Sequence, residues 1–371
     1  MGLLVGELPP GPGNAITDVA GVRVGHTTLI SGDGPLRPGH GPVRTGVTVI
    51  LPHGDNLFRQ KVPGAVHTIN GFGKACGFEE VRELGVIEAP IALTNTLNVG
   101  LVADALVQYA VRQSPEIGIR TSSVNVIVGE CNDGFLNDMQ GRHVRAEHVW
   151  AAIDAADPGM VAEGAVGAGT GTSCFGWKGG IGTASRVVSA GAGGFTVGAL
   201  VQSNYGRPRD LVICGVPVGR RLQPPAAQAT QEKGSIMIVL ATDAPLSDRQ
   251  LRRLCVRAAV GLSRTGSHHM HGSGDFVIAF GTAHRIEHAP ASLVTTRTAL
   301  ADEAMVMAGL FPAVVECVEE AVLNSLCGAD TVVGRDGNTR HGLPVEEVAV
   351  LVRRSQPDPV GDSRDSRQQH S

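Results

Sequence analysis

Basic residues and long apolar runs are both scarce in this chain of 371 residues. Lysine and arginine number 31 against 35 aspartate and glutamate residues, and the formal net charge is -4. No basic stretch is long enough to follow a phosphate backbone, so we expect no nucleic-acid partner. No window reaches roughly 18 consecutive strongly apolar residues, and the amino-terminal segment lacks a basic region followed by a long apolar run. We therefore expect no membrane span and no secretory signal.

Cysteines are few, scattered and odd in number, and none belongs to a C-x-x-C pair. This pattern is typical of reduced thiols and excludes a disulfide framework, which favours a cytoplasmic protein. Most of these cysteines are expected to be small core residues. The seven are Cys76, Cys131, Cys174, Cys214, Cys255, Cys317 and Cys327.

Motifs for cofactors and metals are also missing. The glycine-rich turn 167–171 lacks the lysine of a phosphate-binding loop and the strand-turn-helix context of a dinucleotide site. His268, His269 and His271 lie close together in sequence but lack a fourth ligand on a defined face, so they are interpreted as loop residues. Cys131 has no histidine partner pattern that would mark a nucleophile. The sequence predicts neither a cofactor nor a metal.

Aromatic residues make up only 4% of the chain, whereas glycine occurs 50 times. The core is therefore built from valine, isoleucine, leucine and alanine in strands and helices joined by sharp turns. Strands and helices alternate without a compositional break, which indicates one α/β domain of layered sheets covered by helices. Strands are expected at 47–51, 124–128, 235–242 and 275–280, and helices at 99–111, from Ser247 to near Gly261, and at 298–308 and 313–326 around Pro312. The chain from residue 354 onward is polar and is expected to be disordered.

The junction between Gly234 and Ser235 separates a loop-like segment, 220–234, from an apolar strand that begins at the serine itself. A serine in this position can attack the carbonyl of a small preceding residue, and hydrolysis then frees an amino-terminal serine. The reference pKa of an α-amine is about 7.7 to 8.0, so this amine is suited to act as a general base near neutral pH. A Gly-Ser pair alone is weak evidence, and a plain strand start is the alternative.

Nine segments in order along the chain together resemble one family, the L-aminopeptidase/D-amidase-esterase family, which includes the β-peptidyl aminopeptidases. The resemblance extends from about residue 10 to 350. The segments are GPGNAITDVAGVRVGH (11–26), GVTVILPHG (46–54), VHTINGFGKACG (66–77), APIALTNTLNVG (89–100), VGECNDGFLNDMQGRHV (128–144), GTGTSCFGWKGGIGTASR (169–186), VQSNYG (201–206), GSIMIVLATDAPL (234–246) and RTGSHHMHGSGDFVIAF (264–280).

This resemblance implies a four-layer αββα sandwich of the N-terminal-nucleophile-hydrolase type, with the chain topology of ornithine acetyltransferases. It also implies a single domain, 1–371, that cuts itself between Gly234 and Ser235 into an α chain (1–234) and a β chain (235–371). The implied activity is that of a serine aminopeptidase or amidase which releases small N-terminal residues from peptides, amides or esters. Some members accept D-residues or β-amino acids. A homotetramer of αβ units is implied as well.

The roles of the site residues are carried over from the same resemblance. Ser235 matches the nucleophile and Asn204 the amide that binds the oxyanion. Ser273 and Asp275 match a serine and an acidic residue that form a network with the nucleophile; other members often carry glutamate in place of Asp275. Glu130 matches the carboxylate that receives the ammonium group of the substrate. Some members place an oxyanion-assisting tyrosine two residues further on, where this chain has Asn132.

Other interpretations stay open at this point. Glu130 and Asp275 also suit simple turn caps, and Asn204 before Tyr205-Gly206 suits a turn. An endo-acting oligoamide hydrolase is the nearest enzymatic alternative, although the related nylon-oligomer hydrolases use threonine at the cut. A binding protein on the same scaffold would keep the chain whole, whereas a hydrolase would give two bands on a denaturing gel.

Overall fold

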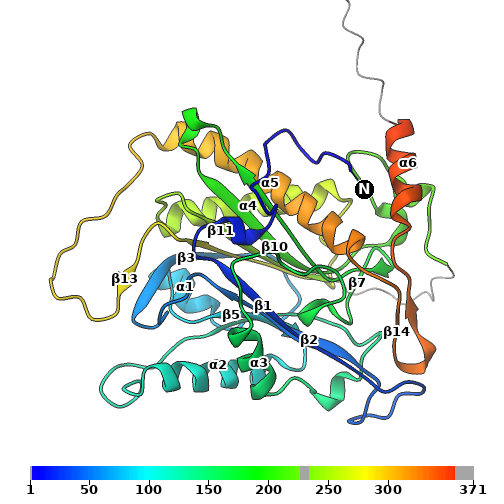
Figure 1. The fold of residues 1–371 in the computed structure, drawn as a ribbon, viewed down its shortest axis with the longest axis horizontal. Helices are drawn as coiled ribbons and strands as arrows, with labels where there is room; N and C mark the ends of the chain where they lie inside the picture. The colour runs from blue at the N-terminus through cyan, green and yellow to red at the C-terminus, as the bar shows by residue number, and fades with distance from the viewer. Residues whose placement is uncertain (1, 226–233, 356–371) are drawn as a thin grey trace, which may run out of the picture.

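Two β-sheets form the centre of the computed structural model, which describes residues 2–225 and 234–355 (Figure 1). The smaller sheet has four strands in the order β1-β2-β5-β6, and its last pair, β5 and β6, is parallel. Its strands are β1 (Arg23–Ser31), β2 (Val43–Leu51), β5 (Ile91–Asn95) and β6 (Ile127–Cys131).

The larger sheet has seven strands in the order β13-β3-β12-β11-β10-β9, with β4 paired to β3. Its central pair, β11 and β12, is parallel, and its other pairs are antiparallel. Its strands are β3 (Gln60–Gly71), β4 (Val86–Ile87), β9 (Ile181–Val187), β10 (Thr196–Asn204), β11 (Ser235–Thr242), β12 (Gly274–Gly281) and β13 (Ile286–Glu287).

Helices cover the outer faces of both sheets (Figure 1). Two long helices, α4 (Asp248–Arg264) and α5 (Glu303–Cys327), pack on the larger sheet, and α2 (Val99–Gln113) and α3 (Ala146–Asp154) pack on the smaller one. The remaining elements are short or peripheral: α1 (Phe78–Leu84), α6 (Val345–Ser355), β7 (Ser173–Cys174), β8 (Trp177–Lys178), β14 (Val332–Val333) and β15 (Thr339–Arg340).

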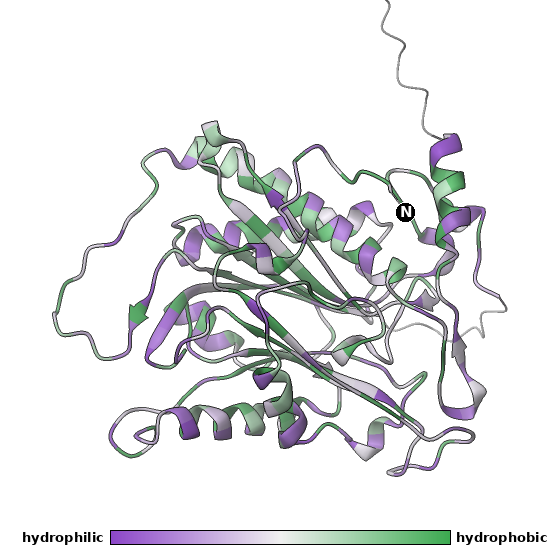
Figure 2. Ribbon diagram, viewed as in Figure 1, coloured by the Kyte–Doolittle hydropathy of each residue, from purple (hydrophilic) through white to green (hydrophobic). Residues whose placement is uncertain are grey.

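Strand β11 shows how the sequence pattern specifies these layers. All eight of its residues are buried, and the strands that flank it are predominantly apolar (Figure 2). Because side chains alternate across a strand, Ile236 and Ile238 point into the core beneath the helices, whereas Met237 and Val239 point into the core between the sheets. Ser235 has the same parity as Met237 and therefore faces the smaller sheet. The predicted strand 235–242 is confirmed.

The strand expected at 124–128 lies three residues later, as β6. Strand β6 starts at Ile127 because its partner in the sheet, β5, begins at Ile91, and Ile91 pairs with Ile127. The backbone N–H of Asn125 donates instead to the carboxylate of Glu88, at 2.8 Å. Glu130 consequently lies inside the strand, not beyond its end.

The helices around Pro312 also differ from expectation, because α5 is one continuous helix with the proline inside it. Its first turn begins after Asp302, whose carboxylate accepts the N–H of Met305 at 2.9 Å. Burial on both sides of the proline stabilises the helix despite the missing N–H. Helix α4 likewise continues beyond Gly261, where a side chain would come within 2.5 Å of the carbonyl oxygen of Val315. Glycine there permits the close contact between α4 and α5.

The two segments expected to be irregular fall largely outside the described residues. Helix α6 extends to Ser355, so residues 354 and 355 are helical and the prediction of disorder from 354 was wrong for them. The rest of that tail, 356–371, lies outside the described residues. So does 226–233 of the loop-like segment before Ser235.

Candidate active site

Ser235 and Asn204 lie opposite each other at the ends of two neighbouring strands, β11 and β10. Nδ2 of Asn204 donates to Oγ of Ser235 at 3.2 Å. Oδ1 of Asn204 accepts the backbone N–H of Ser173 at 3.0 Å. This contact fixes the orientation of the amide, so that its nitrogen is turned toward Ser235. Ser235 is only 5% exposed. The structure therefore places a neutral, oriented N–H donor against a buried hydroxyl, as an oxyanion site requires.

A buried lysine, Lys178 in β8, stabilises the segment that carries Ser173. Nζ of Lys178 donates to the carbonyl oxygens of Gly169, Thr172 and Gly179 at 2.9, 2.8 and 2.5 Å. Burial lowers the pKa of Lys178 to about 7. The three carbonyl acceptors satisfy its N–H groups inside the protein. Lys178 thus supports Ser173, which in turn orients Asn204.

Ser273 and Asp275 form a hydrogen-bonded pair beside the same junction. Oγ of Ser273 donates to Oδ1 of Asp275. Oδ2 of that carboxylate contacts Nδ1 of His269 at 3.3 Å, and Nε2 of the same ring lies 3.2 Å from Oγ of Ser263. The Asn70 side chain donates to the backbone carbonyl of Ser273. The shorter aspartate therefore reaches Ser273, and His269 holds its second oxygen.

Gly234 is packed closely between these groups. Its carbonyl oxygen accepts the backbone N–H of Gly274 at 3.2 Å. A Cβ at this position would lie 3.0 Å from Cβ of Tyr205 and 3.2 Å from Oγ of Ser273. The peptide between Gly234 and Ser235 is thus held by an N–H donor at its carbonyl, with Ser273 alongside.

Glu130 reaches the site from the other sheet. It is 4% exposed, and its carboxylate accepts the backbone N–H of Lys74 at 3.0 Å and the hydroxyl of Thr96. A cavity of about 320 Å³ is lined by Glu130, Gly234 and Ser235 together with Thr96 and Asn132. A buried carboxylate therefore lines the same cavity as the nucleophile candidate.

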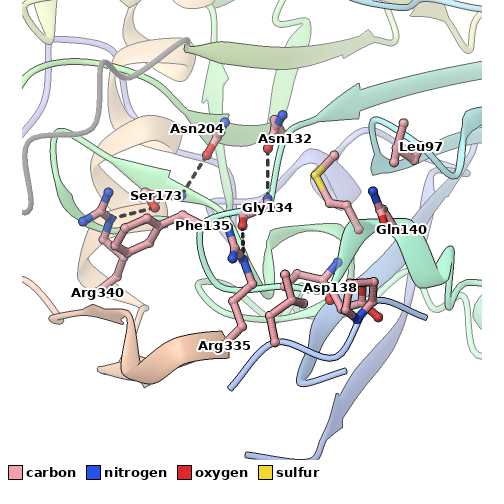
Figure 3. Close-up of a pocket in the computed structure, with 14 residues that line it drawn as sticks. Leu97, Asn132, Gly134, Phe135, Asp138, Gln140, Ser173, Asn204, Arg335 and Arg340 are labelled. Carbon is pink, nitrogen blue, oxygen red and sulfur yellow. Dashed lines mark hydrogen bonds between the residues drawn. The ribbon is translucent and has the colours of Figure 1, made fainter. Parts of the chain in front are cut away.

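Asn132 borders this cavity and a second one. Its Oδ1 accepts the N–H of Gly134 at 2.9 Å, and its nitrogen points away from that turn (Figure 3). The second cavity, of about 600 Å³, is lined by Asn132 and Asn204. Ser235, Glu130, Asn132 and Asn204 thus line two cavities that share Asn132. Ser273 and Asp275 lie beside the Gly234–Ser235 junction and line neither cavity.

Cys131, next to Glu130 in sequence, is not available as a nucleophile. Its thiol is fully buried and donates to the carbonyl of Gln202 at 3.3 Å. Burial raises its pKa well above the usual value, so the thiol stays protonated near neutral pH. All seven cysteines lie within the described residues, and none forms a disulfide bond.

Across residues 2–225 and 234–355, no helix has the length and apolarity needed to cross a membrane. Within the same ranges, no group of three histidine, cysteine, aspartate or glutamate residues is placed to hold a metal ion.

Comparison with known proteins assigns the family. The sequence profile of peptidase family S58 matches residues 14–340. The chain belongs to family S58. A β-peptidyl aminopeptidase of Sphingosinicella xenopeptidilytica is 43% identical over 364 residues, which cover 94% of this chain and 89% of that protein. The chain is therefore an aminopeptidase of the serine type, and the family predicted from its motifs is confirmed.

Solved structures of similar proteins agree with this assignment. A Pyrococcus horikoshii protein is 51% identical, with a TM-score of 0.90, and the match covers 96% of this chain and 98% of that one. The L-aminopeptidase D-Ala-esterase/amidase of Ochrobactrum anthropi is 37% identical, with a TM-score of 0.85 and coverage of 94% and 96%. It is described as a variant of the Ntn hydrolase fold. The family S58 chain thus shares an α/β fold with a serine aminopeptidase.

Several contributors to this site have no signal in the sequence. Thr96, Ser173 and Lys178 belong to segments that resemble the family, yet nothing in the residue types marks their contacts. His269 was interpreted as a plain loop residue, and its contact with Asp275 shows a more specific position. The close approach of the Lys74 turn to Glu130 depends on Gly73, where a Cβ would lie 3.2 Å from a carboxylate oxygen of Glu130.

Proposed function

We propose that this family S58 aminopeptidase cuts its own chain between Gly234 and Ser235 and then uses Ser235 as an N-terminal nucleophile. The observation that carries the proposal is the contact between Asn204 Nδ2 and the Ser235 hydroxyl at the start of a buried strand. The products are an α chain, 1–234, and a β chain, 235–371, within one domain. They stay associated because β11 of the β chain lies between β10 of the α chain and β12, which itself pairs with β3.

For the fold, we propose the four-layer αββα sandwich of N-terminal-nucleophile hydrolases with the topology of ornithine acetyltransferases. Helices on the outer faces of two stacked sheets support the layers. The description of the Ochrobactrum anthropi structure as an Ntn fold variant supports the hydrolase type.

Self-cleavage begins when Oγ of Ser235 attacks the carbonyl carbon of Gly234. The N–H of Gly274 donates to the carbonyl oxygen on which negative charge develops. The C–N bond then breaks, and the hydroxyl proton ends on the nitrogen of Ser235. This leaves an ester between Gly234 and the serine side chain. Water hydrolyses the ester and yields a carboxylate at Gly234 and a free amine at Ser235.

Substrate hydrolysis reuses the same groups. The free amine of Ser235 takes the hydroxyl proton as Oγ attacks the substrate carbonyl, and Asn204 Nδ2 donates to the oxyanion. The proton passes to the departing amine, and water then hydrolyses the acyl-serine ester. Ser273 lies beside the junction at which the new amine forms, and its hydroxyl donates to Asp275, whose second oxygen contacts His269. We assign Asn132, which lines the same cavity as Ser235, the role of a second amide donor.

The substrates we propose are peptides, amides and esters with a small N-terminal residue. The relatives are named for β-peptidyl and for L-aminopeptidase and D-alanyl ester or amide activity, which supports β- and D-residues as acyl groups. Glu130 favours this exo-acting enzyme over an endo-acting oligoamide hydrolase, since a carboxylate in the nucleophile's cavity recognises a free ammonium group. A binding protein that keeps the chain whole would not need the oriented Asn204.

The assembly and location are proposals as well. A homotetramer of αβ units rests on the family resemblance, and sedimentation of the processed protein tests it. We propose a cytoplasmic location because none of the seven cysteines, all of which the structure describes, forms a disulfide bond.

Replacing Glu130 with Gln is expected to lower kcat/KM for alanine anilide about 10- to 150-fold, because a charge-assisted bond to the ammonium group is lost. Gln keeps the shape: its Oε1 can still accept the N–H of Lys74, and its Nε2 can donate to the hydroxyl of Thr96. Self-cleavage should persist, since no free ammonium group lies beside the Gly234 carbonyl. The measurement is the ratio of kcat/KM for free and N-acetylated alanine anilide in parent and variant. An unchanged ratio would make Glu130 a structural acceptor only.

His269→Phe is expected to lower kcat about 5- to 20-fold, with KM little changed, because Asp275 loses one of its hydrogen-bond donors. His269→Asn offers an amide N–H near the position of Nδ1 and should recover part of the loss. The measurement is kcat and KM of both variants and the parent, with kcat expressed per mole of β chain that begins at Ser235. Equal kcat for His269→Phe and the parent would show that the contact of His269 with Asp275 does not contribute to catalysis.

A further inference from the structure

Asn70, near the end of β3, occupies its position because the strand contains a β-bulge. Phe276 of β12 pairs with Thr68, so regular antiparallel pairing would place Ile69 opposite Asp275. The register shifts at this point, and Asn70 pairs with Asp275 instead. A bulge inserts one extra residue and redirects the neighbouring side chains, and bulges are frequent beside active sites. The shift therefore places an amide, and not an apolar side chain, beside Asp275.

The Asn70 side chain holds the loop 265–273, which joins α4 to β12, by its backbone. Nδ2 donates to three carbonyl oxygens of this loop, those of Met270 (3.0 Å), His271 (3.2 Å) and Ser273. The two N–H groups of one amide are thus shared among three acceptors. In the same loop His269 has a φ of 48°, in the left-handed region that costs free energy for a residue with a Cβ. Such a conformation persists where surrounding contacts fix it, and Asn70 supplies part of that restraint.

The contact with Ser273 also orients the next backbone N–H. The carbonyl of Ser273 and the N–H of Gly274 belong to one planar peptide unit and point in opposite directions. Asn70 Nδ2 donates to this carbonyl, as does the N–H of Phe72 at 3.3 Å. At the other end of the unit, the N–H of Gly274 donates to the carbonyl oxygen of Gly234 at 3.2 Å. Fixing the carbonyl therefore fixes the direction of the N–H that faces the bond to be cut.

We propose that Asn70 is a positioning residue for self-cleavage, which holds the N–H of Gly274 toward the Gly234 carbonyl while negative charge develops on its oxygen. The inference rests on the proposed function, because that function assigns the cut to the peptide bond after Gly234. Donation to the Ser273 carbonyl also polarises the peptide, which makes the Gly274 N–H a stronger donor. After the cut Gly234 ends in a carboxylate, and Asn204 binds the oxyanion of the substrate. Asn70 thus serves the formation of the enzyme more than its turnover.

The test measures self-cleavage and turnover separately. The full chain is synthesised in a cell-free translation system, samples are denatured at timed intervals, and the β chain that begins at Ser235 is quantified. Asn70→Ala is expected to slow the formation of this chain about 10- to 100-fold, because the oxyanion donor is kept but no longer held in line. The kcat for alanine anilide, expressed per mole of that β chain, should stay close to the parent value, since Asn204 remains in place.

Three further variants identify the cause. Asn70→Asp keeps the shape of the side chain but turns an oxygen toward the loop carbonyls, so it should slow self-cleavage at least as much as alanine does. Asn70→Gln retains both N–H groups on a longer side chain and should recover part of the rate. Met270→Ala removes an exposed side chain from the same loop and leaves its carbonyl as an acceptor, so it should cleave at the parent rate.

Two results would overturn the inference and leave the proposed function intact. One is an equal rate of self-cleavage in Asn70→Ala and the parent. The other is an equal loss of self-cleavage and of kcat together with a lower Tm, because Asn70 would then only stabilise the loop. If the parent itself yields no chain that begins at Ser235, the proposed function fails, and the inference fails with it.

Discussion

Ser235→Ala is expected to remain a single chain of about 38.4 kDa and to lose peptidase activity about 10⁴-fold or more. Alanine has no oxygen to attack the Gly234 carbonyl, so neither the cut nor the acyl-serine ester can form. The fold should persist, because Ser235 lies at the end of β11 and the apolar residues that follow it form the cores on both sides. A denaturing gel and hydrolysis of alanine anilide measure the two effects.

Ser235→Thr is the matched control for this variant. Threonine keeps the hydroxyl and, being β-branched, suits the first residue of a strand. It should cleave, although more slowly because its extra methyl group must fit a buried position. Two fragments from Ser235→Ala, cut at residue 234, would show that another group performs the cleavage.

Asn204→Ala is expected to lower kcat about 10²- to 10³-fold, the usual loss for one oxyanion donor. Activity is expressed per mole of β chain that begins at Ser235, so that slower self-cleavage of the variant does not contribute to the measured loss of kcat. The backbone pairing of β10 with β11 does not depend on this side chain. Thermal unfolding of the variant checks that the fold is retained.

Asn204→Asp is the sharper comparison. Aspartate keeps the size of the side chain, and one oxygen can still accept the N–H of Ser173 as Oδ1 does now. The other oxygen replaces the N–H that faces Ser235 and would repel an oxyanion. The loss should therefore equal or exceed that of alanine. Full turnover in either variant would remove Asn204 from the oxyanion site.

Local sequence patterns predicted the elements that decide the site. The apolar run that starts at Ser235 forms a strand that is buried on both faces. Such a strand is recognised from its continuous apolar residues, because it does not need to alternate apolar with polar residues. The capping box at Ser247 marks the start of α4 correctly: its hydroxyl accepts the N–H of Gln250, and the Gln250 side chain accepts the N–H of Ser247. These features depend on residues a few positions apart, which is why the sequence shows them directly.

Contacts between distant segments account for what was missed. Arg340 meets Ser173, Asn70 meets Ser273, and Glu130 meets Lys74 across separations that no short pattern encodes. The extent of α5 through Pro312 and of α4 through Gly261 depends on the packing of one helix on the other. The candidate nucleophile and its amide donor came from the family motifs, and the geometry that links them came from the sheet register.

Mass spectrometry of the denatured protein, quenched during turnover of an alanine ester, tests the central claim most directly. The account predicts two fragments, divided between Gly234 and Ser235. It further predicts that only the β chain gains the mass of an alanyl group, and that peptide mapping places this group on Ser235. A single chain of 38.4 kDa, or an alanyl group on any other residue, would contradict it.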